Sequence, residues 1–466
     1  MTENKFKPVL GLWDGTMIVA GSMIGSAIFI VGADILRNVG SAGWLIAVWV
    51  ITGFMTITAA VSYGELSGMY PKAGGQYVYL KEAYNPLLAF IYGWSLFAII
   101  QTGTIAAVGV AFSKFMAYLV PAVSEDLILF NLGFVKIAPS QIVSILLIML
   151  LTFINTRGAQ GGKIIQSIFT STKIISCFGL ILFGFIMMDA DVWAANWLNP
   201  WDLHKLNADG TIETYLAAGA FGAIAAAMVG SIFSSEAWNN VTFVAGEMRN
   251  PKRNLGLSLF LGTLIVSIIY ISINLMYTAV LPLEEIAHAD KDRVAVSAAN
   301  AIFGNTGTII IAIMVMVSTF GCANGMILSG ARVCYTMAKD GLFFSPAGQL
   351  NRFGVPQKAL WMQCILACTW CLSGKYGDIL DMVSFVVVLF YILTIVGIFI
   401  LRRKQPDTER PYKAFAYPFL PIIYIIMALA FCTLLIIYKP NYTWPGLIIA
   451  LLGVPIYYLA LSRKKV

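Results

Sequence analysis

Apolar segments long enough to cross a lipid bilayer recur along the whole chain of 466 residues. A transmembrane helix needs about 20 predominantly apolar residues, and 59% of this chain is hydrophobic whereas 11% is charged. The segments are 13–37, 43–67, 86–120, 137–155, 160–187, 215–247, 254–281, 305–338, 356–373, 376–401, 415–438 and 442–462. The sequence therefore predicts an all-α integral membrane protein with twelve transmembrane helices and little room for a soluble domain.

Basic residues predict the orientation of these helices, because loops on the cytoplasmic side of a membrane carry an excess of Lys and Arg. Assigning alternate loops to the two sides places 20 of the 30 Lys and Arg residues on the side with both termini and 7 on the other. We therefore expect a multi-pass protein of the cell (inner) membrane with both termini cytoplasmic. The net charge of +7 reflects this bias and indicates lipid, rather than nucleic acid, as the partner.

Glycine and serine interrupt the first apolar segment near its middle, where residues 21–26 are Gly-Ser-Met-Ile-Gly-Ser. Both residue types are weaker helix formers than Ala or Leu. Lipid cannot satisfy unwound backbone, so such backbone must line a cavity enclosed by protein. Two half-helices would then present N–H groups and carbonyls to one point, which suits the carboxylate and ammonium of a zwitterion. The alternative is an unbroken helix whose small residues permit close packing.

A second interruption lies in the sixth segment, where residues 230–240 are Gly-Ser-Ile-Phe-Ser-Ser-Glu-Ala-Trp-Asn-Asn. The carboxylate of Glu236 is costly at membrane depth unless it faces water, a partner or a ligand. The two interruptions occupy matching places in two five-helix units, of which one begins inside and the other outside. This pairing is typical of an inverted-repeat transporter with its binding site at the bilayer midplane.

Five motifs occur in order: Gly21-Ser-Met-Ile-Gly-Ser-Ala-Ile-Phe29, Tyr63-Gly-Glu-Leu with Tyr70-Pro-Lys-Ala-Gly-Gly-Gln-Tyr-Val-Tyr79, Trp238-Asn with Glu247-Met-Arg-Asn-Pro-Lys-Arg-Asn254, Gly321-Cys-Ala-Asn-Gly325 through Arg332 with Ala338-Lys-Asp-Gly341, and Asp407-Thr-Glu-Arg-Pro411. Together they resemble the amino acid–polyamine–organocation (APC) superfamily, closest to the L-type amino acid transporters and their bacterial relatives. The resemblance implies the LeuT fold, with 5+5 inverted repeats, two C-terminal helices, and helices 1 and 6 broken. We expect one transporter domain, 1–466, with repeats 13–187 and 215–401 and helices 11–12 in 411–466.

The first break supplies groups for both charges of an amino acid. The N–H groups of Gly25, Ser26 and Ala27 are candidates for the carboxylate, and carbonyls around Met23 and Phe233 are candidates for the ammonium. The family usually has glycine where this chain has Ala27, whose methyl group reduces or shifts the pocket. The predicted substrate-binding residues are Met23, Ile24, Gly25, Ser26, Ala27, Phe233, Ser234, Ser235, Glu236 and Trp238.

Three of these residues have alternative interpretations. By resemblance, Phe233 is the gate over the bound substrate, whereas its alternative role is core packing. Trp238 is either a wall of the pocket or a packing residue. Glu236 stands where L-type relatives usually carry a small or different residue. It pairs with the substrate ammonium or a cationic side chain, or it couples protons to transport, or it caps backbone N–H groups freed by the break.

Lys173 lies about 13 residues inside the fifth segment, where a lysine needs a carbonyl, an acid or water. By resemblance it fits the helix-five lysine of L-type-like carriers, whose ammonium stands where sodium-coupled relatives bind Na⁺. It would bridge helix one to helix eight near Ser318 and Thr319, and its fixed charge argues against sodium coupling. The alternative is a lysine that extends to the inner membrane face.

Neither a cofactor nor a metal is expected. Cys364, Cys368 and Cys371 have the spacing of a radical iron–sulfur motif, but they share one face of an apolar helix, which favours packing. His204 and His288 are the only histidines of the chain, and both fall on outer loops. Animal L-type carriers attach a glycoprotein subunit through a cysteine in the outer loop corresponding to 121–136. This loop contains none, so we expect no disulfide-linked subunit and a monomer or weak dimer.

These observations and the resemblance together predict a secondary active transporter for a small neutral amino acid that is independent of sodium and works as an exchanger. One alternative is a proton-coupled symporter that uses Glu236. Another is a sensor that binds an amino acid without transporting it. An enzyme is not expected, because no nucleophile–base pair or metal cluster lies at membrane depth.

Overall fold

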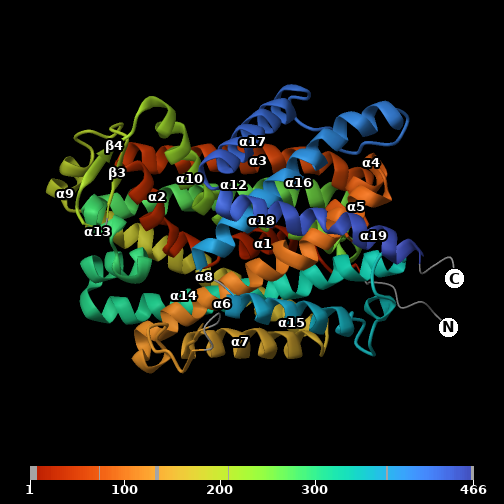
Figure 1. Ribbon diagram of the computed structural model, residues 1–466, viewed down its shortest axis with the longest axis horizontal. Coiled ribbons are helices and arrows are strands. Elements are labelled where there is room, and N and C mark those ends of the chain that lie inside the picture. Colours follow the sequence, from red (N-terminus) through yellow and green to blue (C-terminus); the bar gives the residue numbers. More distant parts are fainter. Residues whose placement is uncertain (1–7, 73, 132–135, 208, 374–375, 463–466) are drawn as a thin grey trace.

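The computed structural model describes residues 8–72, 74–131, 136–207, 209–373 and 376–462. Most helices run along the long axis of the molecule (Figure 1). In the first half these are α1 (Leu12–Met23), η1 (Ala27–Phe29), α2 (Val31–Val39), α3 (Ala42–Met69), α4 (Gln76–Ala83), α5 (Pro86–Ser95), the π-helical η2 (Leu96–Ile100), α6 (Gln101–Leu119), η3 (Pro121–Val123), α7 (Pro139–Asn155), α8 (Ala159–Ile186), α9 (Ala190–Asn196) and α10 (Ala217–Ser234).

The second half continues the helical pattern. Its elements are α11 (Asn240–Phe243), η4 (Ala245–Glu247), α12 (Pro251–Val280), α13 (Leu283–Ala287), η5 (Asp290–Asp292), α14 (Val294–Lys339), η6 (Ser345–Gly348), α15 (Gln357–Ser373), α16 (Tyr376–Lys404), α17 (Phe419–Tyr438), α18 (Pro440–Leu451) and α19 (Gly453–Ser462). Two antiparallel hairpins interrupt the all-α pattern, β1 (Phe130–Asn131) with β2 (Lys136–Ile137), and β3 (His204–Leu206) with β4 (Ile212–Thr214). Both hairpins lie in connections between long helices.

Seven helices in the described part of the chain are long and apolar enough to cross a membrane. Shorter apolar helices cover Pro139–Asn155, Gly219–Ser234 and Thr443–Leu459. Helices also occupy each of the twelve predicted ranges, although α14 begins at Val294, earlier than expected, and bends at Gly304. The chain is therefore a multi-pass membrane protein, and the number of twelve spans remains a prediction.

The connections alternate between two ends of the molecule. Figure 1 shows α9, α13 and the β3–β4 hairpin at one end, and α4 and α19 at the other. This arrangement matches the alternate loops assumed in the charge analysis. The cytoplasmic assignment of the termini remains a prediction, because the arrangement of the helices does not show which end faces the cytoplasm.

Both predicted interruptions are present, each somewhat later than the start of its small-residue motif. Helix α1 continues to Met23 and helical structure resumes at Ala27, whereas α10 continues to Ser234 and α11 begins at Asn240. Within α10 the Ser234 hydroxyl donates to the carbonyl of Gly230 one turn earlier, at 2.8 Å, so this polar side chain is satisfied inside the helix. The break after α10 contains Ala237 with φ of 67°. A non-glycine residue in this left-handed conformation is strained by about 1–2 kcal/mol.

Candidate functional site

The ends of the two interrupted helices meet at a tyrosine that the sequence analysis did not identify. Tyr270 of α12 is 1% exposed, and its hydroxyl lies 2.8 Å from the carbonyl oxygen of Met23 and 2.9 Å from that of Ser234. A phenol carries one proton, so it donates to one of these carbonyls at a time. The C-terminal ends of α1 and α10 therefore share one hydrogen-bond donor.

Lys173 donates hydrogen bonds to two further carbonyls at the first break. Its side chain is fully buried, and its Nζ atom donates to the carbonyl oxygens of Gly21 at 2.6 Å and Ile24 at 2.8 Å. The hydroxyl of Ser318 on α14 donates to the same Ile24 oxygen at 3.3 Å. An extension of Lys173 to the membrane face is therefore wrong for this structure, because the ammonium ends at the break.

Thr319 does not join Ser318 at the break. Its hydroxyl donates to the carbonyls of Val315 and Met316 within its own helix, at 3.0 and 2.8 Å. The two adjacent residues differ because successive helix positions face directions about 100° apart, so a helix that presents Ser318 to α1 turns Thr319 away.

At the first break, the backbone carbonyls already accept hydrogen bonds, whereas the N–H groups at 25–27 do not yet donate any within the described residues. The carbonyl of Ser22 accepts from the thiol of Cys322 at 3.2 Å, and those of Gly21, Met23 and Ile24 accept from Lys173, Tyr270 and Ser318 as described above. In contrast, the N–H groups at 25–27 donate to no acceptor among the described residues. These N–H groups offer direct hydrogen bonds to an anionic group such as a carboxylate.

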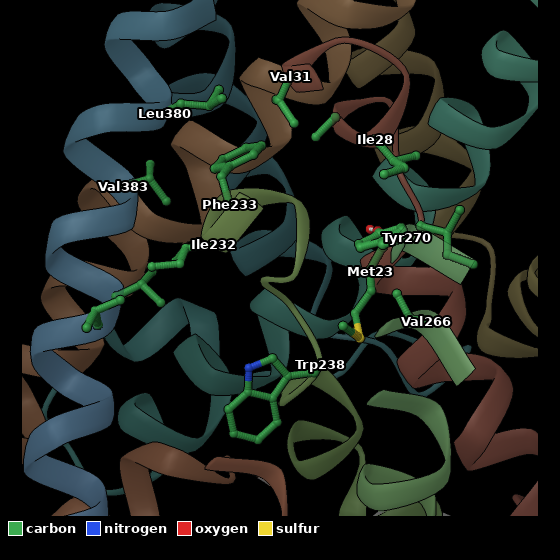
Figure 2. Close-up of a cluster of buried hydrophobic side chains, with 14 of the residues drawn as sticks. Met23, Ile28, Val31, Ile232, Phe233, Trp238, Val266, Tyr270, Leu380 and Val383 are labelled. Atoms are coloured by element: carbon green, nitrogen blue, oxygen red, sulfur yellow. Dashed lines mark hydrogen bonds between the residues drawn. The ribbon is translucent and has the colours of Figure 1, made fainter. Parts of the chain in front are cut away.

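Phe233 lies beside two residues that line a large cavity. Figure 2 shows its ring between Val31 of α2 and Leu380 of α16, and both of these residues line a cavity of about 830 Å³. This cavity reaches the end of the molecule that carries α13, and its charged lining residues are Asp34, Arg37, Lys114, Glu125, Asp126, Asp292, Asp381 and Lys439. The phenyl ring, 6% exposed, lies between the Val31 and Leu380 side chains of the cavity wall.

Trp238 lies on the other side of the second break from Phe233 (Figure 2). Its indole is 2% exposed and packs edge-on against Tyr63, with ring centres 4.7 Å apart, and at a tilt against Tyr391 at 5.1 Å. Aromatic pairs of this geometry stabilise a packed core. Ser235 and Glu236 line a small cavity together with Trp238.

Glu236 has a hydroxyl partner but no cationic one. Its Oε1 atom accepts from the hydroxyl of Tyr391 at 3.1 Å, and in the described ranges no Lys, Arg or His side chain lies within 4.0 Å of its carboxylate. The carboxylate lines two cavities of about 10 and 20 Å³, each near the size that holds one water molecule. Pairing with a cationic side chain of this chain is therefore not supported, whereas the other interpretations stay open.

The predicted cysteine cluster packs along α15. Cys364 and Cys371 are buried and Cys368 is half-buried. Among the described residues, no group of three His, Cys, Asp or Glu side chains is arranged to hold a metal ion.

Comparison with known proteins gives a consistent family. A family model described as "Amino acid permease" matches residues 10–461. The "Large neutral amino acids transporter small subunit 2" of Homo sapiens is 29% identical over 459 residues, which cover 97% of this chain and 80% of that protein. The "Serine/threonine exchanger SteT" of Bacillus subtilis (strain 168) is 28% identical over 465 residues, 99% of each chain. The "b(0,+)-type amino acid transporter 1" of Homo sapiens is 27% identical over 461 residues, which cover 98% of this chain and 88% of that protein.

Proposed function

The chain belongs to the amino acid permease family of the APC superfamily, and from this premise we propose that it is a sodium-independent exchanger for a small neutral amino acid. Its relatives are transporters rather than enzymes, and the printed names of two of them specify large neutral amino acids and serine or threonine. The observation that carries the proposal is the first break, where free N–H groups lie beside occupied carbonyls and a buried lysine.

We propose the LeuT arrangement for the fold, with twelve spans, repeats 13–187 and 215–401, and helices 11–12 in 411–466 within a single domain, 1–466. Two interrupted helices whose ends meet at one hydroxyl are what this arrangement requires. We also propose an inner-membrane location with cytoplasmic termini, and a monomer or weak dimer without a disulfide-linked subunit.

The substrate carboxylate is proposed to bind the N–H groups of Gly25, Ser26 and Ala27, because these donors have no other acceptor in the described structure. The ammonium is proposed to bind the carbonyls at Met23 and Phe233. The Met23 oxygen shares the single proton of Tyr270 with the carbonyl oxygen of Ser234, so the hydroxyl can remain on Ser234 while the ammonium donates to Met23.

The remaining predicted residues enclose this point. Phe233 is proposed to close over the substrate, since its ring lies between Val31 and Leu380, which line the outer cavity. Ile24, Ser234, Ser235 and Trp238 are proposed as walls, and Glu236 as a second acceptor for the ammonium.

Sodium independence follows from the proposed role of Lys173. Its ammonium donates to two carbonyl oxygens, and carbonyls are ligands that a hard cation would otherwise use. A second positive charge at the same oxygens would be repelled in this buried site.

Counterflow in proteoliposomes tests the exchange proposal. Radiolabelled serine is expected to accumulate in vesicles preloaded with unlabelled amino acid, and at the same initial rate in sodium and in choline buffer. Empty vesicles should take up only background label. Accumulation in empty vesicles under an inward proton gradient would instead support the symporter, and ligand binding without flux would support the sensor.

The proton symporter is the second candidate, because Glu236 lacks a cationic partner. If exchange is correct, Glu236→Gln should leave the pH dependence of serine uptake unchanged. Its KM should rise about tenfold, the ratio that corresponds to about 1.4 kcal/mol, because the neutral amide attracts the ammonium less. A pH profile that flattens in the variant would support proton coupling. Tyr391→Phe is the control, since it removes the hydroxyl donor and keeps the carboxylate.

A further inference from the structure

The chain that follows the second break is attached at its start to two other elements. The side-chain amide of Asn239 donates to Oε1 of Gln76 on α4 at 3.0 Å, and the Gln76 amide donates to the Thr394 hydroxyl on α16 at 2.9 Å. All three side chains are buried. Buried amides need such partners, because an unsatisfied polar group costs about 1–3 kcal/mol.

A buried ion pair attaches the same stretch at its far end. Oε1 of Glu247 accepts from Nε and Nη2 of Arg332 on α14, at 2.8 and 2.7 Å. The Arg332 and Glu247 side chains are only 2% and 12% exposed. Loss of one partner would leave an uncompensated charge at a buried position. Separation of the Glu247 and Arg332 side chains therefore costs free energy.

Main-chain hydrogen bonds connect this stretch to the start of the chain. The N–H groups of Val9 and Leu10 donate to the carbonyl of Glu247, both at 2.9 Å, and that of Arg249 donates to the carbonyl of Leu10 at 2.7 Å. Leu10 lies two residues before Leu12, where α1 begins. Residues 239–249 and the start of α1 are therefore joined by backbone contacts, whereas side chains join residues 239–249 to α4 and α14, and through Gln76 to α16.

Two glycines of the turn before α4 let its backbone pass closely between α11 and α14. A Cβ atom on Gly75 would lie 2.1 Å from Oγ1 of Thr242, and one on Gly74 would lie 3.0 Å from Cγ2 of Thr336. Gly75 also has φ of 44°, a conformation that L side chains rarely adopt. The turn before α4 is thus packed closely against α11 and α14, at the end of the molecule opposite to the 830 Å³ cavity.

We propose that the Asn239–Gln76 and Glu247–Arg332 contacts form an inner clamp, which keeps the inner end closed while the outer cavity is open. Opening then requires α1 and residues 239–249 to separate together from α4, α14 and α16 by breaking both contacts. Gln76, Glu247 and Arg332 are therefore positioning residues, and their role rests on the proposed transport function.

Cys322 provides a native reporter of this opening. It is 1% exposed on α14, and its thiol donates to the carbonyl of Ser22 beside the first break, so withdrawal of α1 would uncover it. The test uses the full chain with the other six cysteines replaced by alanine or serine. The measurement is the rate at which an impermeant maleimide labels Cys322 in inside-out vesicles without substrate.

In the Glu247→Gln variant, the maleimide should label Cys322 at least about tenfold faster than in the parent. This ratio corresponds to a loss of about 1.4 kcal/mol in the stabilisation of the closed state. Arg402→Gln is the matched control. It disrupts another two-bond ion pair, with the fully buried Glu65, which joins α16 to α3 rather than to residues 239–249. The control should label at the parental rate, and a charge exchange at Glu247 and Arg332 should restore slow labelling.

Equal rates for Glu247→Gln and its parent would overturn the inner clamp, as would equal acceleration in Arg402→Gln. If Glu247→Gln does not reach the membrane, Asn239→Ala tests the other contact with the same expected direction. Labelling needs no flux, so a chain that fails in counterflow but responds here would contradict the proposed function and not the inner clamp.

Discussion

Lys173→Met is expected to reduce amino acid exchange at least about 100-fold. The ammonium donates to the carbonyl oxygens of Gly21 and Ile24 in a fully buried position. Hydrogen bonds from charged donors contribute about 1.5–3 kcal/mol each, so the loss of two corresponds to at least a 100-fold change in an equilibrium constant. Methionine fills a similar volume but donates nothing, and the backbone at 24–26 loses the group that fixes it.

The measurement is the initial rate of serine counterflow in proteoliposomes that contain equal amounts of folded protein. Ser318→Ala serves as a graded control, because it removes only the longer 3.3 Å hydrogen bond to Ile24 and should lower the rate about tenfold or less. Exchange by Lys173→Met within threefold of the native rate would contradict the proposed role, and so would sodium-stimulated uptake by the native protein.

Both interruptions were predictable from local sequence, but their limits were not. Glycine and serine in the middle of an apolar segment indicate where a helix weakens. Ser234 nevertheless remains helical, and the carbonyl of Gly230 one turn earlier accepts the hydrogen bond of its hydroxyl. The composition of a segment does not show whether a serine hydroxyl will bond to a carbonyl within the helix or whether the helix will end at that serine.

Partners from distant parts of the chain were the harder problem. The burial of Lys173 identified a need for acceptors, and resemblance suggested helix one, but nothing local to Lys173 selects the oxygens of Gly21 and Ile24. Glu236 was singled out by its charge, whereas the hydroxyl of Tyr391 depends on a contact across 155 residues. Such pairs are determined by tertiary packing rather than by periodicity.

Tyr270 was missed because a tyrosine in an apolar segment resembles ordinary core packing. A signal was present, since Tyr270, Asn274 and Tyr277 are spaced at i, i+4 and i+7 and so share one face of α12. Polar side chains on one face of a membrane helix indicate a buried contact rather than lipid. This face meets both interrupted helices through the Tyr270 hydroxyl.

Tyr270→Phe is expected to lower the exchange rate about tenfold or more and to increase the thermal stabilisation given by substrate. Without the hydroxyl, the carbonyls of Met23 and Ser234 lose their shared donor, which costs about 1–3 kcal/mol in a buried site. A substrate ammonium restores a donor to the Met23 oxygen, so the bound state loses less free energy than the empty one. Turnover falls because release must expose both acceptors again.

Tyr277→Phe provides the matched control for this substitution. Tyr277 lies two turns further along α12, is fully buried, and its hydroxyl has no hydrogen bond to the described residues. The same chemical change there should alter neither the exchange rate nor the serine-induced rise in Tm. If Tyr270→Phe shows the native rise in Tm, the ammonium does not use the carbonyl of Met23. The proposed position of the ammonium would then have to move toward the other proposed acceptors, the carbonyl of Phe233 and the carboxylate of Glu236.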